Sequence, residues 1–414
     1  MKKLTLFVPV ICIGLILGCD SLNSSNPDTS SKETNKHENN KDDKEFAYVT
    51  EHFADLKILR YQIPGFDELT KKQKELCYYL YEAALAGRDI IWDQNYKHNL
   101  YIRRTLEAIV NTYSGDKNSE DYHKFSVFTK RVWFSNGIHH HYSNNKIVPE
   151  FTEDYFALLV KKSDKKELPL QRGESVQDLI SKITNILYNP DVAPKKVNLN
   201  PEDDLVASSA TNFYEDVAQK EVESFYKTKI NSDDKTPISH GLNSKVTKRN
   251  GKIIEQVWKV GGMYTEAIEK IVYWLELAIT VAENEQQKLA FEKLVEYYKT
   301  GDLKKFDEYS IAWVNDINST VDVINGFIEV YGDPLGYKGS FESVVSIKDM
   351  EATKRIEAIG KEAQWFEDNS SIMANHKKEN VTGISAKVIT VVVESGDASP
   401  STPIGINLPN ANWS

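Results

Sequence analysis

An acid and a phenol stand two residues apart in the stretch 326–342, whose sequence is GFIEVYGDPLGYKGSFE. Polar and apolar residues alternate at its start as in a strand, so Glu329 and Tyr331 should share one face, where both can hydrogen-bond a ligand. A proline and two glycines then predict a turn, and the β-branched run 340–347 predicts a returning strand. The pattern also fits an ordinary half-buried hairpin, so by itself it identifies no function.

Three consecutive histidines, His139 to His141, suggest a metal site, because imidazole is a common ligand of transition metals. Successive strand residues point to opposite faces, so only His139 and His141 can converge, and no carboxylate at a supporting spacing completes the site. We therefore interpret the three histidines as a polar loop, flanked by aromatic residues, that lines a groove.

Composition and missing motifs exclude several classes of function. The 414 residues are 40% apolar and 27% charged, which is typical of globular proteins, and their formal net charge is −10. Nucleic-acid binding needs clustered Lys and Arg, so we expect none. The sequence has no Gly-x-Ser-x-Gly elbow, P-loop, dinucleotide fingerprint, Cys-x-x-Cys, His-Glu-x-x-His or His-Glu-x-x-x-His. From these residues we predict no metal ligands in the chain.

The N-terminus looks like an export signal. Two lysines precede the apolar run 4–17, which is too short to span a membrane and ends in LILGC, similar to a bacterial lipobox with Cys19 as the lipidated residue. We expect residues 1–19 to be a lipoprotein signal peptide, with plain secretory cleavage as the alternative, and residues 20–45 to be a disordered tether. The protein would then be an exported bacterial lipoprotein, anchored to a membrane at the periplasmic face or outer membrane. Cys77 would be the one remaining cysteine, so we expect no internal disulfide.

Apolar residues recur at helical spacing along most of the chain. The helix that opens near Thr70 should end at Gly87, or another backbone should approach closely there. Its buried face should consist of Leu76, Cys77, Leu80, Ala83 and Ala84. We predict further helices at 101–110, 203–228, 255–300 with a break near Asn284, 306–316 and 348–366, a strand at 387–394, and loops at 195–201 and 237–251. This pattern predicts an α+β fold, mostly helical with a mixed β-core.

Two separated stretches, 326–342 and 405–410 (GINLPN), resemble dipeptidyl peptidase III, a family of zinc-dependent exopeptidases. Residues 83–89 and 133–142 are similar to the bacterial branch of that family. The likeness begins near Phe46 and extends to Trp413, and the pair of motifs is specific.

The resemblance implies two lobes around a wide cleft. Residues 46–342 would form the helical and β-core substrate-binding lobe, and residues 343–386 a helical segment of the second lobe. Residues 387–414 would supply a β-core strand and a peptide-binding edge. The ligands would be short peptides with free N-termini.

The same resemblance implies roles for four residues. Glu329, Asn407 and Asn410 would hold the protonated N-terminus of a peptide, because an ammonium group needs oxygen acceptors on several sides. Tyr331 would donate a hydrogen bond to the developing oxyanion. Residues 401–405 would pair with the peptide as an added strand.

The sequence departs from the family pattern at several positions. Gly332 and Lys338 stand where arginine is frequent, and Glu342 matches a recurrent acid whose role is less defined. The family's zinc motif, His-Glu-x-x-Gly-His, and its glutamate ligand follow the stretch 405–410, whereas this chain ends at Ser414. We therefore expect a chain truncated before most of the zinc lobe, without zinc ligands and inactive by itself. Its complete form would release N-terminal dipeptides.

Two alternatives to a peptidase remain open. In the first, the chain is a lipid-anchored peptide-binding protein without catalysis, which holds free N-termini with Glu329, Asn407 and Asn410. In the second, it is a truncation product that folds poorly, because missing elements would leave strand edges and apolar faces uncovered.

Overall fold

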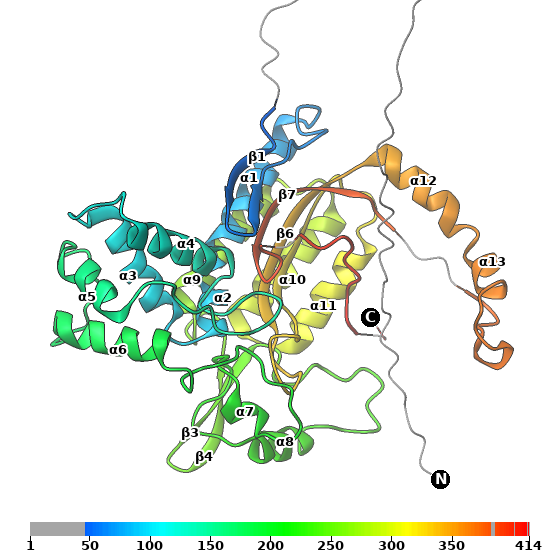
Figure 1. The fold of residues 1–414 in the computed structure, drawn as a ribbon. Coiled ribbons are helices and arrows are strands. Elements are labelled where there is room, and N and C mark those ends of the chain that lie inside the picture. Colours follow the sequence, from blue (N-terminus) through cyan, green and yellow to red (C-terminus); the bar gives the residue numbers. More distant parts are fainter. Residues whose placement is uncertain (1–45, 382–385, 401, 412, 414) are drawn as a thin grey trace, which may run out of the picture. The chain divides into compact units, whose positions relative to one another are not determined.

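The computed structural model describes residues 46–381, 386–400, 402–411 and 413 (Figure 1). The expected signal peptide, the lipidated Cys19 and the tether at 20–45 lie outside the described residues. Residues Val49–Ser414 form one compact unit, and their expected division after residues 342 and 386 stays a prediction. Among the described residues, no helix combines the length and the apolar character that crossing a membrane requires.

The described residues are mostly helical, with short strands between groups of helices. The helices are α1 (Lys71–Ala86), α2 (Arg88–Asn95), α3 (Asn99–Thr112), α4 (Glu120–Phe134), α5 (Glu153–Lys161), α6 (Val176–Tyr188), α7 (Leu205–Ser208), α8 (Gln219–Lys227), α9 (Thr265–Thr280), α10 (Glu285–Thr300), α11 (Leu303–Asn315), α12 (Met350–Gly360), α13 (Ala363–Asp368) and the 3₁₀ helix η1 (Ala374–His376). The strands are β1 (Val49–Phe53), β2 (Leu56–Leu59), β3 (Ser244–Arg249), β4 (Lys252–Val257), β5 (Val321–Glu329), β6 (Ser340–Lys348) and β7 (Ile389–Gly396). The predicted α+β class with a majority of helix is confirmed.

The described strands pair only in antiparallel fashion. β1 pairs with β2, β3 pairs with β4, and the largest sheet has the order β5-β6-β7 (Figure 1). β5 has a bulge at Ile328, because Phe327 pairs with Phe341 whereas Glu329 pairs with Ser340. The β-core is therefore antiparallel in the described part of the chain, where we expected a mixed one.

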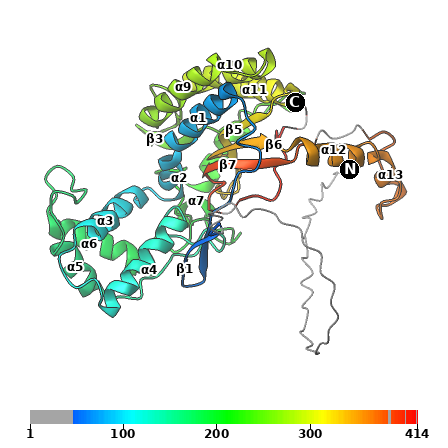
Figure 2. The same cartoon turned by 90° about the horizontal axis from the view of Figure 1, so that it is seen from above.

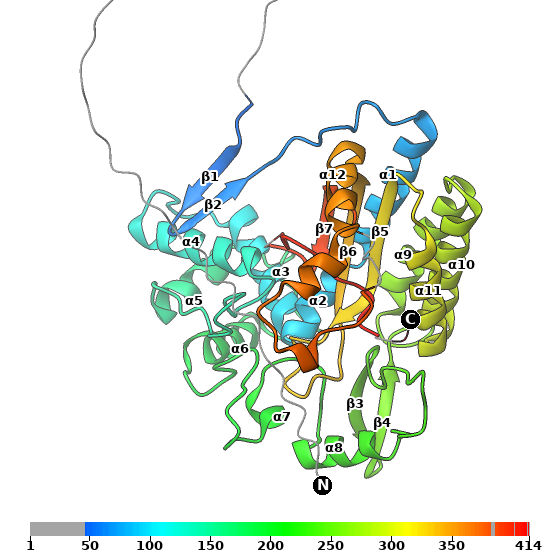
Figure 3. The ribbon, with the colours of Figure 1, turned by 90° about the vertical axis from the view of Figure 1, so that its right-hand side faces the viewer.

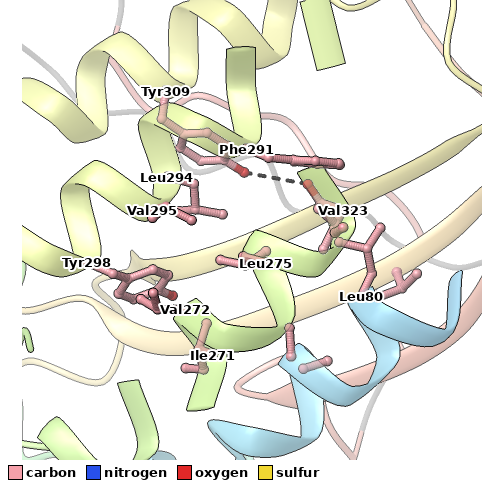
Figure 4. Packing of buried hydrophobic residues seen from close by; sticks show 14 of the residues in the cluster. Leu80, Ile271, Val272, Leu275, Phe291, Leu294, Val295, Tyr298, Tyr309 and Val323 are labelled. Carbon is pink, nitrogen blue, oxygen red and sulfur yellow. Dashed lines mark hydrogen bonds between the residues drawn. The ribbon is translucent and has the colours of Figure 1, made fainter. Parts of the chain in front are cut away.

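Helices α1, α9, α10 and α11 cover one face of the β5-β6-β7 sheet (Figure 2). In Figure 4, Leu80 of α1, Leu275 of α9 and Leu294 of α10 lie in one apolar core with Val323 of β5. The Tyr309 hydroxyl of α11 donates a hydrogen bond to the Val323 carbonyl at 3.5 Å. Each buried leucine stabilises the fold by about 1.5–3 kcal/mol, so this core holds the sheet firmly against the helices.

Helix α1 has the buried face that its sequence predicts. Its N-terminus has a capping box in which the Thr70 side chain accepts from the Gln73 backbone and the Gln73 side chain accepts from the Thr70 backbone. The buried residues of this helix are Leu76, Cys77, Leu80, Ala83 and Ala84. α1 ends at Gly87, as predicted, and the group that approaches this glycine is a side chain, the ring of Phe341 in β6, and not backbone. Cys77 is buried with a free thiol.

The prediction of one helix over all of 203–228 and of a loop over all of 237–251 is wrong. The first stretch contains two short helices, α7 and α8, and Tyr214 between them forms an isolated β-bridge with Val246. The second stretch is not a loop, because it contains strand β3. The turn of the β3-β4 hairpin is Asn250-Gly251, with φ angles of 51° and 75°. Asn-Gly is the residue pair that tight hairpins favour, so the sequence did contain the signal.

The long helical region predicted at 255–300 is confirmed only in part. Its first residues belong to β4, and α9 begins at Thr265. The break near Asn284 is confirmed, because the Asn284 side chain caps the N-terminus of α10. Gly301 caps the C-terminus of α10 with a φ of 72°. The helices predicted at 306–316 and 348–366 correspond to α11 and to α12 with α13.

Candidate functional site

Four acidic residues gather at one end of the β5-β6-β7 sheet. Glu329 is the last residue of β5, Glu342 lies in β6, Glu394 lies in β7, and Asp397 follows β7. The register of β6 and β7 places Glu342 and Glu394 on the same face of the sheet, because side chains alternate along a strand. We call these four residues the acid cluster.

The chain after β7 folds back over the sheet face that carries the acid cluster. Ala398, Ile406 and Leu408 pack there with an apolar cluster that includes Ile324 of β5 and Val344 of β6. Figure 3 shows this segment in red in front of the sheet. Burial of these apolar side chains returns the chain to the end of β5 and so positions the residues around 410.

Hydrogen bonds hold the returning segment at both ends. Asn136 Nδ2 donates to the Ser399 carbonyl at 2.8 Å, and Thr402 Oγ1 donates to Glu394 Oε2 at 2.6 Å. At the far end, the Asn410 side chain lies beside the Glu329 carboxylate and acts to lower its pKa, as a hydrogen-bond donor does. An ionised carboxylate can only accept, so the amide nitrogen of Asn410 donates, and its amide oxygen can accept from another group.

Burial and mutual repulsion make the acid cluster hard to ionise. Burial raises the pKa of Glu329, and the nearby charge of Asp397 raises it further. Glu342 is only 6% exposed, and its burial, together with the charges of Asp397, Glu329 and Glu394, raises its pKa to about 8. Burial also raises the pKa of Glu394, although the bond from Thr402 opposes that rise.

Two carboxylate oxygens of the acid cluster are buried without a hydrogen bond from the described residues, namely Glu342 Oε2 and Glu394 Oε1. Leaving a buried acceptor unpaired costs about 1–3 kcal/mol, and more for a charged group. The cluster therefore has a surplus of acceptors and of negative charge. A cationic hydrogen-bond donor such as an ammonium group would satisfy both.

A cavity of about 440 Å³ adjoins the acid cluster at Glu394. Trp92 and Trp133 line it together with Asn136 and Ser395. Aromatic surface beside polar groups is typical of pockets that accept a side chain of a ligand.

The turn between β5 and β6 is organised by Asp333, whose importance the sequence analysis missed. This residue is 5% exposed, and its carboxylate accepts from the Tyr214 hydroxyl at 2.7 Å. It also accepts from the backbone amides of Leu335, Tyr337 and Lys338 at 2.7–3.0 Å. An aspartate before a proline commonly bonds the following backbone in a turn, so the Asp-Pro pair was the available signal.

Lys338 anchors the same turn from within the protein. Its side chain is fully buried, and Nζ donates to the Tyr226 hydroxyl, to the Gly241 carbonyl at 3.2 Å and to Ser244 Oγ at 3.2 Å. Burial lowers the pKa of Lys338 to about 7. The three acceptors account for the three N–H groups of an ammonium, so this lysine fits its site well.

A comparison with known families shows which class of protein has this arrangement. Residues 180–412 match the model of Peptidase family M49. The chain belongs to Peptidase family M49. The matching stretch contains the β5-β6-β7 sheet, the acid cluster and the returning segment up to Asn410.

This M49 chain is similar to proteins called dipeptidyl peptidase 3. It is 23% identical over 393 residues to the protein of Dictyostelium discoideum, covering 88% of this chain and 54% of that one. It is also 23% identical over 316 residues to the protein of Mus musculus, covering 70% and 42%. The solved structure of DPP III from Caldithrix abyssi aligns with a TM-score of 0.58 at 20% identity, over 83% of this chain and 53% of that one, which shows a shared fold. The chain thus spans about half the length of these relatives.

The M49 fold brings two of the predicted site residues, Glu329 and Asn410, into contact. Asn407 is exposed on the same returning segment. Tyr331 is 82% exposed and lies in the turn beyond β5, so the prediction that it shares a strand face with Glu329 is wrong. The reason is that β5 ends at Glu329, so Tyr331 no longer follows the alternation of the strand, and an alternating pattern does not show where a strand ends. The described residues 402–405 lie outside any strand, and their pairing with a peptide stays a prediction.

The three histidines of this M49 chain lie in an irregular turn flanked by the aromatic rings of Phe134 and Tyr142, as predicted, although one of them is buried. His139 is 2% exposed, and its Nε2 lies 2.8 Å from the Ala193 carbonyl oxygen. The His140 ring stacks on His141 with 4.5 Å between centroids, and His140 lines a separate cavity of about 290 Å³. Within the part of the chain that the structure describes, no three His, Cys, Asp or Glu side chains are grouped as a metal site.

Proposed function

We propose that this chain is the substrate-holding part of a dipeptidyl peptidase III-like peptidase and that it binds short peptides by their protonated N-termini. The observation that carries the proposal is the contact between Glu329 and Asn410, at the edge of an acid cluster with unpaired oxygens. The names of the relatives in Dictyostelium and mouse support peptides as the class of ligand.

The chemistry of the site suits an ammonium group. Three N–H donors require acceptors in several directions, and the Glu329 carboxylate with the amide oxygens of Asn407 and Asn410 would supply them. Hydrogen bonds to charged groups contribute about 1.5–3 kcal/mol each. Acetylation of the peptide removes the charge and two of the donors, so the site would discriminate strongly against blocked N-termini.

Tyr331 would act on the bound peptide rather than on its amine. Its exposed hydroxyl, on the turn that Asp333 and Lys338 hold in place, could donate to a peptide carbonyl oxygen on which negative charge develops. The zinc implied by the family does not fit the described residues. No three described His, Cys, Asp or Glu side chains are grouped so that they could hold a metal ion. In the histidine run, His139 Nε2 is already engaged with a carbonyl. The proposal therefore concerns peptide binding and assigns no hydrolytic step to these residues.

Titration calorimetry with a tetrapeptide and its N-acetylated form tests the proposal. We expect the free peptide to bind and the acetylated form to bind at least about tenfold more weakly, which corresponds to about 1.4 kcal/mol. Glu329→Gln should weaken binding of the free peptide to a similar degree. The control is Glu285→Gln on α10, whose side chain is 93% exposed and which should bind as the wild type does. Equal affinity for the two peptides would overturn the proposal.

A further inference from the structure

Glu342 is the most deeply placed member of the acid cluster, and a carboxylate acts on it from each neighbouring strand and from the chain after β7. Glu329 approaches it from β5, Glu394 from β7, and Asp397 from the chain that follows β7. Among the described residues, the cations in this neighbourhood are Lys196, which acts on Asp397, and Arg88 and Arg103, which line the same cavity as Glu394. The strand partners of Glu342 itself are the glycines at 326 and 396, which carry no side-chain charge or donor.

The geometry of Glu342 disfavours the ionised form when no ligand is present. Its side chain is 94% buried (6% exposed), and Oε2 receives no hydrogen bond from the described residues. An ionised carboxylate there would leave a charged oxygen without a donor among three like charges, which is costly in a buried place. The pKa of Glu342 is raised to about 8 by the same two causes, its burial and the negative charges around it.

A bound ammonium group would reverse this balance. Held by Glu329 and Asn410, it would place a positive charge and spare N–H donors next to the acid cluster. Because Glu342 interacts with Glu329 through its charge, a cation beside Glu329 favours the ionised form of Glu342 as well.

We propose that Glu342 is a further residue of the amine-binding site, which holds a proton while the site is empty and releases it to solvent when a peptide N-terminus binds. This inference rests on the proposed peptide binding and adds a measurable property to it. In the bound state the ammonium group is paired with two carboxylates, Glu329 and Glu342. In the empty site the proton on Glu342 avoids the repulsion between these two carboxylates. Peptide binding would accordingly be coupled to proton release.

Calorimetry of peptide binding in two buffers with different ionisation enthalpies measures this release directly. At about pH 6.5 the α-amino group of a peptide, with a pKa near 7.7–8.0, is already protonated, so the peptide itself exchanges almost no proton. We expect the wild type to release close to one proton per bound tetrapeptide. The glutamine in Glu342→Gln cannot ionise, so this variant should release nearly one proton fewer per bound tetrapeptide than the wild type. Glu285→Gln should release as many protons as the wild type does.

Two results would overturn the inference. In the first, the wild type binds the peptide but its heat of binding is the same in both buffers. In the second, the heat of binding of Glu342→Gln depends on the buffer as strongly as that of the wild type does. Equal binding of the acetylated peptide would instead refute the amine site as a whole, so the two failures are distinguishable. Infrared difference spectra of the wild type provide a test without a variant. The carbonyl band of a protonated carboxylic acid should disappear when the peptide is added, and its persistence would also overturn the inference.

Discussion

Gly87 and Phe341 lie so close together that a Cβ atom on the glycine would be 2.0 Å from Cζ of the ring. The glycine joins α1 to α2, and the phenylalanine precedes Glu342 in β6. The missing side chain therefore sets how closely the helices approach the strand that carries the acid cluster. The glycine that ends helix α1 therefore also determines how deeply the acid cluster is buried, although the cluster lies far along the chain.

Gly87→Ala should destabilise the protein by about 1–3 kcal/mol, because the Phe341 ring is fully buried and can yield only by moving the strand or the helices. Urea unfolding followed by circular dichroism measures the change. Gly405→Ala is the matched control, since a Cβ there meets open space. Equal stability of the two variants would contradict the packing described for β6.

Glu342→Gln should stabilise the protein at about pH 8 and change little at about pH 4. The folded pKa of about 8 lies above the ordinary value of 4.5, so between these values the unfolded chain loses its proton first. The free energy of unfolding of the wild type then falls as the pH rises, by up to about 1.4 kcal/mol per pH unit from this group. Urea titrations at several pH values show whether the advantage of the variant grows with pH. A constant difference would mean that Glu342 has an ordinary pKa.

Lys338→Met should destabilise the protein by about 3 kcal/mol or more, because it leaves three buried oxygen atoms without their donor. The side chain of methionine is similar in length, so packing changes little. Lys304→Met, at an exposed position of α11, should stay within about 0.5 kcal/mol of the wild type. Thermal unfolding of both variants checks the expectation, and a stabilised Lys338→Met protein would show that the buried charge is a net burden.

Asn410→Ala should weaken peptide binding by about tenfold, because Glu329 loses its donor and the ammonium group loses one acceptor. The stability of the fold should change little, since Asn410 is exposed at the end of the returning segment. Calorimetry with the free tetrapeptide measures the affinity, and the acetylated peptide shows whether the loss is specific to the amine. An unchanged affinity would remove Asn410 from the site.

The local parts of this structure could be predicted from the sequence. The buried face of α1, the start of α10 after Asn284 and the cap at Gly301 all follow from side-chain periodicity and capping within a few residues. The β3-β4 hairpin was missed although Asn250-Gly251 signals it, because the helical spacing that follows was extended backwards over β4.

The site itself depends on contacts between distant residues. The pairing of β6 with β7 brings Glu394 and Asp397 to Glu342, and no local pattern encodes that register. The resemblance to a family identified Glu329 and Asn410, which lie next to each other in the structure, whereas their role in holding a peptide stays a prediction. It did not reveal that β5 ends at Glu329, before Tyr331, because the alternation of polar and apolar residues continues past the end of the strand.

The three strands of the main sheet do not become available together as the chain is made. β5 and β6 form a local hairpin, whereas β7 reaches β6 only after α12, α13 and η1 have been synthesised. Contacts across such separations form late, because a longer loop must close before they are gained. Glu342 would therefore fold into its strand before it meets the carboxylates of β7 or the amide of Asn410. A nascent chain can hold its β5-β6 hairpin before the proposed amine site exists, because that site is completed only with the last docking step.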